Sequence, residues 1–222
     1  MGGRRLSSFY AGSHPWLDPP LTLLTIHRER QQPSSDSARA SAPLLPSPPA
    51  LVSDDIERII HELAMRGVAM QRWPARASLT PVASEEEILA AYSDEIARVQ
   101  RGGRYPTVDA IRMTPSHPER AALRQKFLAE HTHSDDEVRF FVEGRGLFCL
   151  HIGDEVLQVL CERNDWIAVP AGTKHWFDMG AEPSFCALRF FHNSEGWVAR
   201  FTGDPIADHY PLLEAPLAIA GP

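Results

Sequence analysis

The sequence predicts a mainly β fold, an antiparallel β-sandwich or small barrel, preceded by a few α-helices. After residue 130 the chain consists of short β-rich runs separated by Gly, Asp and Asn, with no helical pattern between them. Strands joined by such tight turns pair antiparallel and close into a sandwich or barrel. Upstream, two segments combine helical periodicity with capping residues. The length of 222 residues suits one well-buried core rather than two domains.

The beginning of the chain contains two stretches with the composition of loose chain. Residues 1–20 contain Gly, Pro and Ser without periodicity, which predicts a disordered N-terminal tail. The run "LTLLTIHRE" at 21–29 predicts a first strand, and the Pro/Ser/Ala-rich segment 30–50 predicts a surface loop. We therefore expect a single domain over residues 21–222.

Three helices are predicted before the β region. The first covers Ser53–Gly67, where Asp54 and Glu57 suit a capping box. The second covers Ser84–Gly103 as one continuous helix, with a Ser and a Glu at the same capping positions. A third, shorter helix is predicted over 118–127, with Pro near its first turn. The apolar faces of the first two helices consist of Ile56, Ile59, Ile60 and Leu63, and of Ile88, Tyr92, Ile96 and Val99.

Six β-rich runs follow, each ended by turn residues. They lie at 137–144, 146–154, 155–165, 166–172, 174–180 and 184–193.

Composition excludes several classes of protein. The chain has 22 basic and 29 acidic side chains, a net charge of −7, which argues against a protein that coats nucleic acid phosphates. The three cysteines have no C-x-x-C spacing and lie in apolar sequence, as in a reducing compartment. No apolar run approaches the length of a membrane span. We expect a cytoplasmic protein with neither a nucleic acid nor a membrane partner.

The residues best suited to bind a metal ion or a substrate are concentrated in "EHTHSDDEVRFFVEGRG" at 130–146. In an extended chain, the odd-numbered residues His131, His133, Glu137 and Arg139 share a face, with a possible bulge at Ser134–Asp136. Burying two imidazoles and a carboxylate unpaired is costly, and a divalent metal ion offsets that cost by coordinating all three. The pattern therefore indicates a metal site.

A fourth candidate ligand is His175, which follows the turn "PAGTKH". Three histidines and one carboxylate leave two open positions on an octahedral ion, as a bidentate substrate, or a substrate with dioxygen, requires. Arg139, on the same face, suits the binding of an anionic substrate or enolate.

Simpler interpretations exist for each of these residues. An isolated H-x-H is usually a solvated or hydrogen-bonded pair, and a structural zinc site usually recruits cysteine. Phe140, Phe177 and Trp197 are core aromatics by default. Asp135 and Asp136 are turn residues in the simplest interpretation, with a hydrogen bond to a ligand imidazole as the alternative. The combination of four ligand residues favours the metal site over these separate explanations.

Two motifs carry a family resemblance. The pattern H-x-H, three residues, E, six residues, G matches His131, His133, Glu137 and Gly144, and P-x-G-x-x-H matches Pro170, Gly172 and His175. At these residues the sequence resembles the cupin superfamily. Within it, the runs "HSDDEVRFFVEGRGLF" and "VPAGTKHWFDMG" resemble the acireductone dioxygenases of methionine salvage. The resemblance is close over residues 130–197 and looser upstream.

The resemblance implies a cupin-type double-stranded β-helix, or jelly-roll barrel, with a few N-terminal α-helices packed outside. It implies one Fe(II) or Ni(II) ion on the four ligands, and an acireductone substrate, 1,2-dihydroxy-3-keto-5-methylthiopentene, that reacts with O2. Fe-loaded members yield formate and 4-methylthio-2-oxobutanoate, whereas Ni-loaded members yield formate, carbon monoxide and 3-methylthiopropanoate.

The same resemblance assigns roles around the ion. Arg139 is the catalytic and substrate-binding cation, and Phe177, Trp197 and Phe140 line the methylthio side. By strand alternation, however, Phe140 faces the other way unless the strand twists. The family also suggests a monomer.

Two other functions remain open at this point. Another metal-dependent cupin enzyme, a quercetinase-like dioxygenase or a sugar isomerase, would keep the ligands and differ in the anion-binding residue and the aromatic wall. A non-catalytic ligand-binding cupin predicts degraded ligands or an attached DNA-binding domain. The run "DDEVRFFVEGRG" and the complete ligand set favour the acireductone family.

Overall fold

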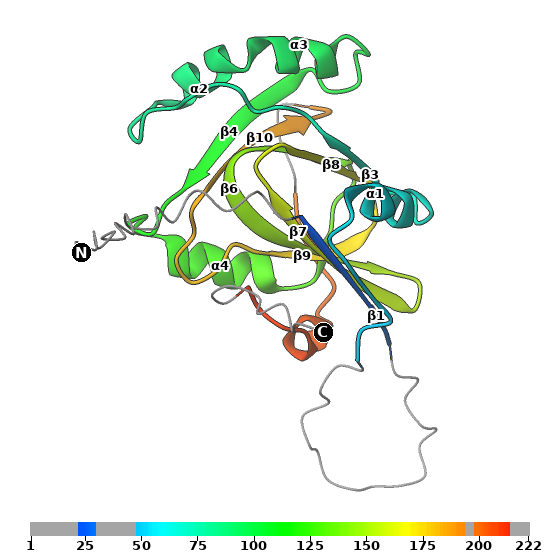
Figure 1. The fold of residues 1–222 in the computed structure, drawn as a ribbon. Helices are drawn as coiled ribbons and strands as arrows, with labels where there is room; N and C mark the ends of the chain where they lie inside the picture. Colours follow the sequence, from blue (N-terminus) through cyan, green and yellow to red (C-terminus); the bar gives the residue numbers. More distant parts are fainter. Residues whose placement is uncertain (1–21, 30–47, 194–197, 214–222) are drawn as a thin grey trace, which may run out of the picture.

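The computed structural model describes residues 22–29, 48–193 and 198–213 (Figure 1). The predicted tail, the greater part of the predicted loop at 30–50, and Trp197 lie outside these residues.

The described chain is built mainly from strands. They are β1 (Leu23–Arg28), β2 (Leu51–Ser53), β3 (Ala69–Arg72), β4 (Thr107–Met113), β5 (His131–Thr132), β6 (Glu137–Ile152), β7 (Glu155–Glu162), β8 (Asp165–Val169), β9 (Lys174–Asp178), β10 (Phe185–Phe191) and β11 (Arg200–Phe201). The helices are α1 (Ile56–Ala64), α2 (Glu85–Ala91), α3 (Ser93–Gln100), α4 (Arg120–Leu128) and the 3-10 helix η1 (Pro205–His209).

The strands form two antiparallel layers that share the long strand β6. Layer 1 has the order β11-β5-β9-β6-β7-β1-β2, and layer 2 has the order β4-β10-β6-β8-β3. The layers face each other around a buried core, while α2 and α3 lie outside beside β4 and α1 closes another side (Figure 1). This is the jelly-roll barrel with helices packed outside that the family resemblance implies.

The sequence predicts two strands, at 137–144 and 146–154, whereas the structure has one continuous strand, β6, that changes layers at a bulge. Along β10, Cys186 pairs with Glu143 while Ala187 pairs with Phe141, so Val142 is the extra residue. Gly144 follows with a φ of +62°, and a Cβ there would lie 1.7 Å from the Ser184 carbonyl oxygen. The bulge and this glycine carry one strand from layer 2 into layer 1.

The bulge also reverses which residues face the interior. Before it, Phe141 belongs to the central core; after it, Phe148 and Leu150 do. Leu147 and Cys149 instead pack on the outer side of layer 1. Alternation therefore holds within each half of β6, but with opposite parity.

Two helix predictions need correction. The N-cap of α1 is Asp55 rather than Asp54, because the Asp55 carboxylate accepts hydrogen bonds from the backbone N–H groups of Glu57 and Arg58. The predicted helix over 84–103 is broken at Tyr92, which has φ −117° and ψ 25°. The capping box at Ser84 is confirmed, and the third predicted helix corresponds to α4.

The break at Tyr92 has a packing reason. The Tyr92 ring is 1% exposed and packs edge-on against Phe140, with ring centroids 5.9 Å apart. Its hydroxyl donates to the Ala77 carbonyl oxygen. Burial of this large ring against layer 2 outweighs the helical hydrogen bonds lost at the break.

Four strands were not predicted from the sequence, and one of them is the two-residue strand β11, which pairs with β5. β2, β3 and β4 are short or lack clear alternation, and they pair with β1, β8 and β10 respectively. β2 directly follows the predicted loop, and its last residue, Ser53, is the first residue of the predicted first helix. Such segments become strands because a neighbouring strand edge satisfies their backbone groups.

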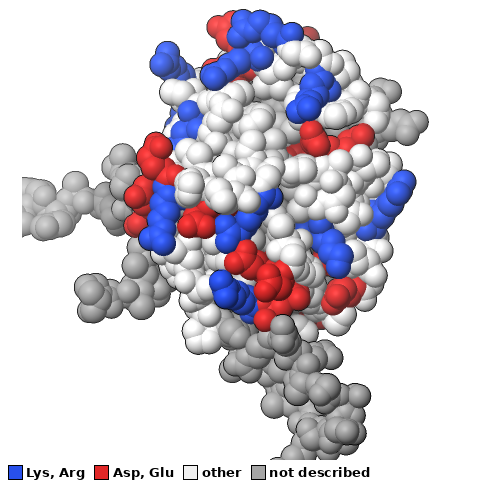
Figure 2. Space-filling view, turned by 90° about the vertical axis from the view of Figure 1, so that its right-hand side faces the viewer, with Lys and Arg blue, Asp and Glu red and all other residues white. Residues whose placement is uncertain are grey.

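The surface carries both signs of charge. On the face shown in Figure 2, Lys and Arg side chains are interspersed with Asp and Glu around a broad uncharged area. Within the described residues, no helix has the length and hydropathy needed to cross a bilayer.

Candidate metal centre

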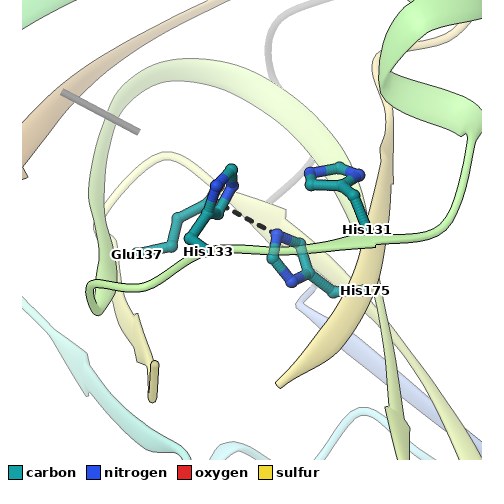
Figure 3. A group of neighbouring side chains, drawn as sticks. All are labelled: His131, His133, Glu137 and His175. Carbon is teal, nitrogen blue, oxygen red and sulfur yellow. Dashed lines mark hydrogen bonds and ion pairs between the residues drawn. The ribbon is translucent and has the colours of Figure 1, made fainter. Parts of the chain in front are cut away.

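Three histidines and one glutamate converge inside the barrel (Figure 3). His131 lies on β5, His133 follows it, Glu137 begins β6 and His175 lies on β9. In the β5–β9 pair, His131 and His175 are directly opposed. The four residues predicted as ligands are therefore brought together, although 38 positions separate Glu137 from His175.

The donor atoms surround one point. Glu137 Oε2 lies 3.1 Å from His133 Nε2 and 2.9 Å from His175 Nε2. The ring centroid of His131 lies 5.0 Å from that of His133 and 4.5 Å from that of His175. All four ligand atoms lie within 4.8 Å of one another.

Backbone carbonyls orient two of the imidazoles. His131 Nδ1 lies 2.7 Å from the Ala129 carbonyl oxygen, and His175 Nδ1 lies 2.8 Å from that of Thr173. A carbonyl oxygen only accepts, so each Nδ1 carries the proton and donates it. Each Nε2 is directed at the cluster and can bind an ion once it carries no proton, which is the arrangement of metal-binding histidines.

Burial and charge shift the pKa values of three of these groups, two of them toward the form that binds a metal ion. All four are nearly inaccessible, with exposures from 2% to 7%. Burial and the neighbouring His175 lower the pKa of His131 to about 4, so its ring is neutral at neutral pH. Burial alone would raise the pKa of Glu137, but Arg139 and His175 hold it well below its ordinary value. His175 responds oppositely: burial disfavours its charged form, yet Glu137 raises its pKa.

The geometry fits a single divalent ion. Donor atoms bound side by side at about 2.1 Å from an ion lie about 3 Å apart, close to the 2.9 and 3.1 Å found between Glu137 and its two histidine partners. Imidazole nitrogen with one carboxylate suits iron, nickel, copper or zinc.

Arg139 is the cation of the site. Its Nη2 lies 2.7 Å from Glu137 Oε1, and its guanidinium carbon lies 4.5 Å from the Phe177 ring centroid and 5.1 Å from that of Phe148. Burial lowers the pKa of Arg139 from its ordinary value, while Glu137 opposes that shift. The side chain is 6% exposed and is held between a ligand carboxylate and two aromatic rings.

The Phe177 ring occupies space that is open because Gly146 has no side chain. A Cβ at Gly146 would lie 2.3 Å from Phe177 Cζ, so only glycine leaves room for the ring where it lies. Phe177 is 2% exposed and contacts Phe148 with centroids 5.0 Å apart. Among the described residues predicted for the aromatic wall, Phe177 is the one that lies beside Arg139.

Phe140 is not retained in that wall. Its ring packs against Trp73 and Tyr92 on the outer side of layer 2, away from the cluster. Neighbouring residues of a strand face opposite sides, and Arg139 faces inward. Trp197 lies outside the described residues.

Two aromatic residues near the cluster were missed. Phe148 faces Arg139 only because the bulge in β6 reverses its parity, which no sequence signal announces. Phe201 pairs with His131 across the β11–β5 contact, and their ring centroids lie 5.7 Å apart. It is 52% exposed, and a two-residue strand gives no periodicity by which to find it.

A jelly-roll barrel with an inward-facing cluster of three histidines and one glutamate defines a metal-binding cupin. The family model for the ARD/ARD' family matches residues 50–199, which is more than half of the chain. The chain belongs to the acireductone dioxygenase family, and it is therefore an enzyme of the dioxygenase class.

Similar proteins agree with this assignment. An acireductone dioxygenase of Prochlorococcus marinus (strain MIT 9313) is 69% identical over 193 residues, which cover 87% of this chain and 100% of that protein. An acireductone dioxygenase of Synechococcus sp. (strain RCC307) is 67% identical over 168 residues, covering 76% and 91%.

A solved structure shares the fold. Acireductone dioxygenase from Bacillus anthracis, with a cadmium ion in its active centre, has a TM-score of 0.64 and 28% identity. The match covers 83% of this chain and 100% of that one.

Proposed function

We propose that this enzyme cleaves 1,2-dihydroxy-3-keto-5-methylthiopentene with O2 in methionine salvage, using one Fe(II) or Ni(II) ion per monomer. The observation that carries the proposal is the buried cluster of His131, His133, Glu137 and His175 with Arg139 directly beside it. The relatives named acireductone dioxygenase support the substrate class.

A bound divalent ion would supply Lewis acidity toward an enediolate substrate and a centre for its reaction with dioxygen. The chain's own contribution is to hold the donors ready. The carbonyls of Ala129 and Thr173 fix two imidazoles with Nε2 toward the cluster, which removes the cost of orienting them when the ion binds.

Arg139 would bind and orient the substrate. An enediolate brings negative charge into a site that already contains Glu137, and a buried guanidinium beside that carboxylate offsets it. The two aromatic rings against the guanidinium restrict its movement, so its donors point in a defined direction.

The aromatic wall would receive the apolar end of the substrate. Phe177 is buried beside Arg139 and continuous with the central core. A methylthio group matches such a surface in polarity, and thioethers pack favourably against aromatic rings. Trp197 stays a prediction for the same wall.

The metal ion would decide the products. The Fe form would yield formate and 4-methylthio-2-oxobutanoate, and the Ni form would yield formate, carbon monoxide and 3-methylthiopropanoate. Both ions suit the same imidazole and carboxylate donors, so metal supply selects the branch.

We further propose a monomeric cytoplasmic enzyme. The three cysteines, Cys149, Cys161 and Cys186, are unpaired and buried, as is usual in a reducing compartment.

The test is oxygen uptake on freshly generated acireductone by apoprotein reconstituted separately with Fe(II) and Ni(II). Keto acid and carbon monoxide are assayed in each reaction, and turnover with the expected products supports the proposal. Two results contradict it: absence of turnover despite stoichiometric metal binding, or folded His131→Ala and Glu137→Ala proteins that retain metal and oxygen uptake.

A further inference from the structure

The ligands come from two separate segments that must be held in register. One runs from His131 to Glu137, and the other is the turn from Pro170 to His175. Between β5 and β6 the first segment leaves layer 1 and enters layer 2, so its residues 133–136 belong to no strand. His133 is therefore not positioned by the backbone hydrogen bonds between paired strands.

Two hydrogen bonds join these segments at the crossing. The Gly172 N–H donates to the His133 carbonyl oxygen at 2.9 Å. The Ala171 N–H donates to Asp136 Oδ1 at 3.0 Å. Asp136 directly precedes the ligand Glu137, and its side chain thus connects this segment to the turn that precedes the ligand His175.

The second oxygen of Asp136 is anchored to the barrel wall. The Tyr105 hydroxyl donates to Asp136 Oδ2 at 2.9 Å, and His192 Nε2 lies 3.7 Å from the same oxygen. Tyr105 is 7% exposed and belongs to the apolar cluster on the outer side of layer 2. Its ring also contacts the His192 ring, with centroids 4.9 Å apart. The carboxylate is consequently held from both sides.

We propose that Asp136 is a positioning residue of the metal site, which holds the His133–Glu137 segment against the His175 turn at the spacing one ion requires. This inference rests on the proposed metal-dependent function. Asp136 accepts hydrogen bonds from a backbone N–H and from a tyrosine hydroxyl, so it acts on the spacing of the two ligand segments.

The adjacent carboxylate offers a matched control. Asp135 Oδ2 accepts from Asn193 Nδ2 at 2.9 Å in an exposed contact, and it bridges no ligand-bearing segment. Asp135→Ala and Asp136→Ala remove the same group from neighbouring positions of one loop. A general effect of the loop would appear in both variants, whereas a positioning effect would appear only in the second.

The experiment compares Co(II) and Ni(II) binding by the full chain and its variants, using chelator competition for Kd and the visible spectrum of the Co(II) protein for ligand geometry. Asp136→Ala is expected to weaken binding about 10- to 100-fold, as loss of supporting contacts around metal ligands does, and to alter the spectrum. Asp135→Ala is expected to match the parent. Asp136→Asn keeps an oxygen for Ala171 and should recover most of the affinity.

Tyr105→Phe provides a second route if Asp136→Ala does not fold. It keeps the buried ring and removes only the hydroxyl that anchors Asp136. Weaker metal binding with an altered Co(II) spectrum supports the proposal, and parental affinity and spectrum overturn it.

Three further outcomes would overturn either the positioning role of Asp136 or the proposed function. Parental affinity and spectrum in folded Asp136→Ala overturn the positioning role, and so does an equal loss in Asp135→Ala. Failure of the parent chain to bind either ion overturns the proposed function itself, which separates the two failures.

Discussion

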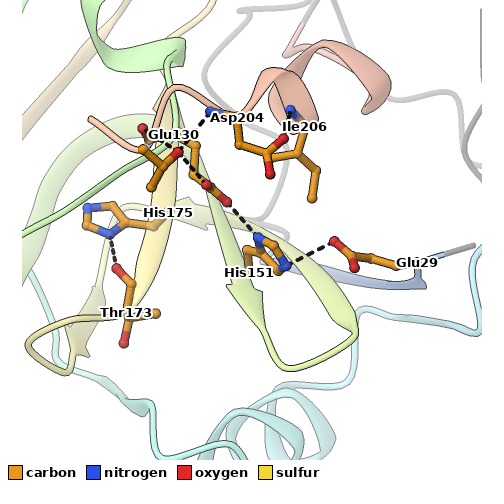
Figure 4. A network of polar contacts seen from close by, with 8 residues as sticks. Glu29, Glu130, His151, Thr173, His175, Asp204 and Ile206 are labelled. Atoms are coloured by element: carbon orange, nitrogen blue, oxygen red, sulfur yellow. Dashed lines mark hydrogen bonds and ion pairs between the residues drawn. The ribbon is translucent and has the colours of Figure 1, made fainter. Parts of the chain in front are cut away.

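Two clusters of histidine and glutamate lie close together in this molecule, and only one of them is arranged for a metal ion. The metal cluster consists of His131, His133, Glu137 and His175. The second, which we call the His151 cluster, consists of His151, Glu29, Glu130 and Thr202. Glu130 directly precedes the ligand His131, so the two clusters are neighbours in sequence and in space (Figure 4).

The clusters differ in what each imidazole nitrogen contacts. His151 Nδ1 lies 2.6 Å from Glu130 Oε1, and its Nε2 lies 2.9 Å from Glu29 Oε1. The Thr202 hydroxyl donates to Glu130 Oε2 at 2.6 Å. Both nitrogens of His151 therefore face carboxylates of two different residues. His175 instead is held by the Thr173 carbonyl through Nδ1 (Figure 4) and directs Nε2 at Glu137 Oε2, the oxygen that His133 also contacts. Residue type alone does not make a metal ligand; a nitrogen directed at a shared point does.

The largest expected effect on the metal site comes from the metal cluster itself. His131→Gln keeps an amide N–H for the Ala129 carbonyl but removes the nitrogen that faces the ion. Loss of a supporting partner costs about 10- to 100-fold in metal affinity, so loss of a ligand should cost about 100-fold or more. Isothermal titration with Ni(II) measures this change, and near-parental affinity in a folded protein would remove His131 from the ligand set.

An effect on catalysis without loss of metal affinity is expected from Arg139, which lies beside the metal cluster. In Arg139→Met, the ion should still bind, because removing a nearby positive charge does not weaken the binding of a cation. The value of kcat/KM should fall about 10²- to 10³-fold, as on loss of a group that stabilises developing negative charge.

Steady-state oxygen uptake by the metal-loaded Arg139→Met protein measures the loss, with metal content determined in parallel. Unchanged kcat/KM at full metal content would show that Arg139 has a structural role only.

The smallest effect on the metal site is expected from His151→Gln, the same substitution made in the second cluster. Metal affinity should stay within about twofold of the parent, because His151 contacts no ligand side chain. The free energy of unfolding should fall by about 1–3 kcal/mol, since one glutamine amide cannot bridge Glu130 and Glu29 as the two imidazole nitrogens do.

Urea unfolding and Ni(II) titration of the His151→Gln protein test both parts. A large loss of metal affinity without loss of stability would mean that the two clusters are coupled through Glu130.

Much of the metal site could be predicted because its residues carry local signals. His131, His133 and Glu137 lie within seven positions, and the turn before His175 has its own glycine and proline pattern. Buried strands and tight turns of this kind are specified over short distances. The mainly β class and the first and third helices were predictable for the same reason, with an error of one residue at the Asp55 cap.

The remainder depended on contacts between distant parts of the chain. Phe148 faces Arg139 because of one extra residue, Val142, at the bulge where β6 pairs with β10. The helix broke at Tyr92 because its ring is buried against Phe140. Asp136 is similar, since its partners Tyr105 and Ala171 are both distant in sequence.

The sequence by itself determined which side chains could bind a metal ion, since donor chemistry and the spacing of neighbouring ligands are properties of residues and short segments. Only the tertiary structure decided which histidines direct a nitrogen at a common point, which aromatic rings face Arg139, and what holds the two ligand segments together. The physical reason is that orientation inside a close-packed core is set by neighbours from other strands, and a single bulge or buried ring redirects every side chain that follows it.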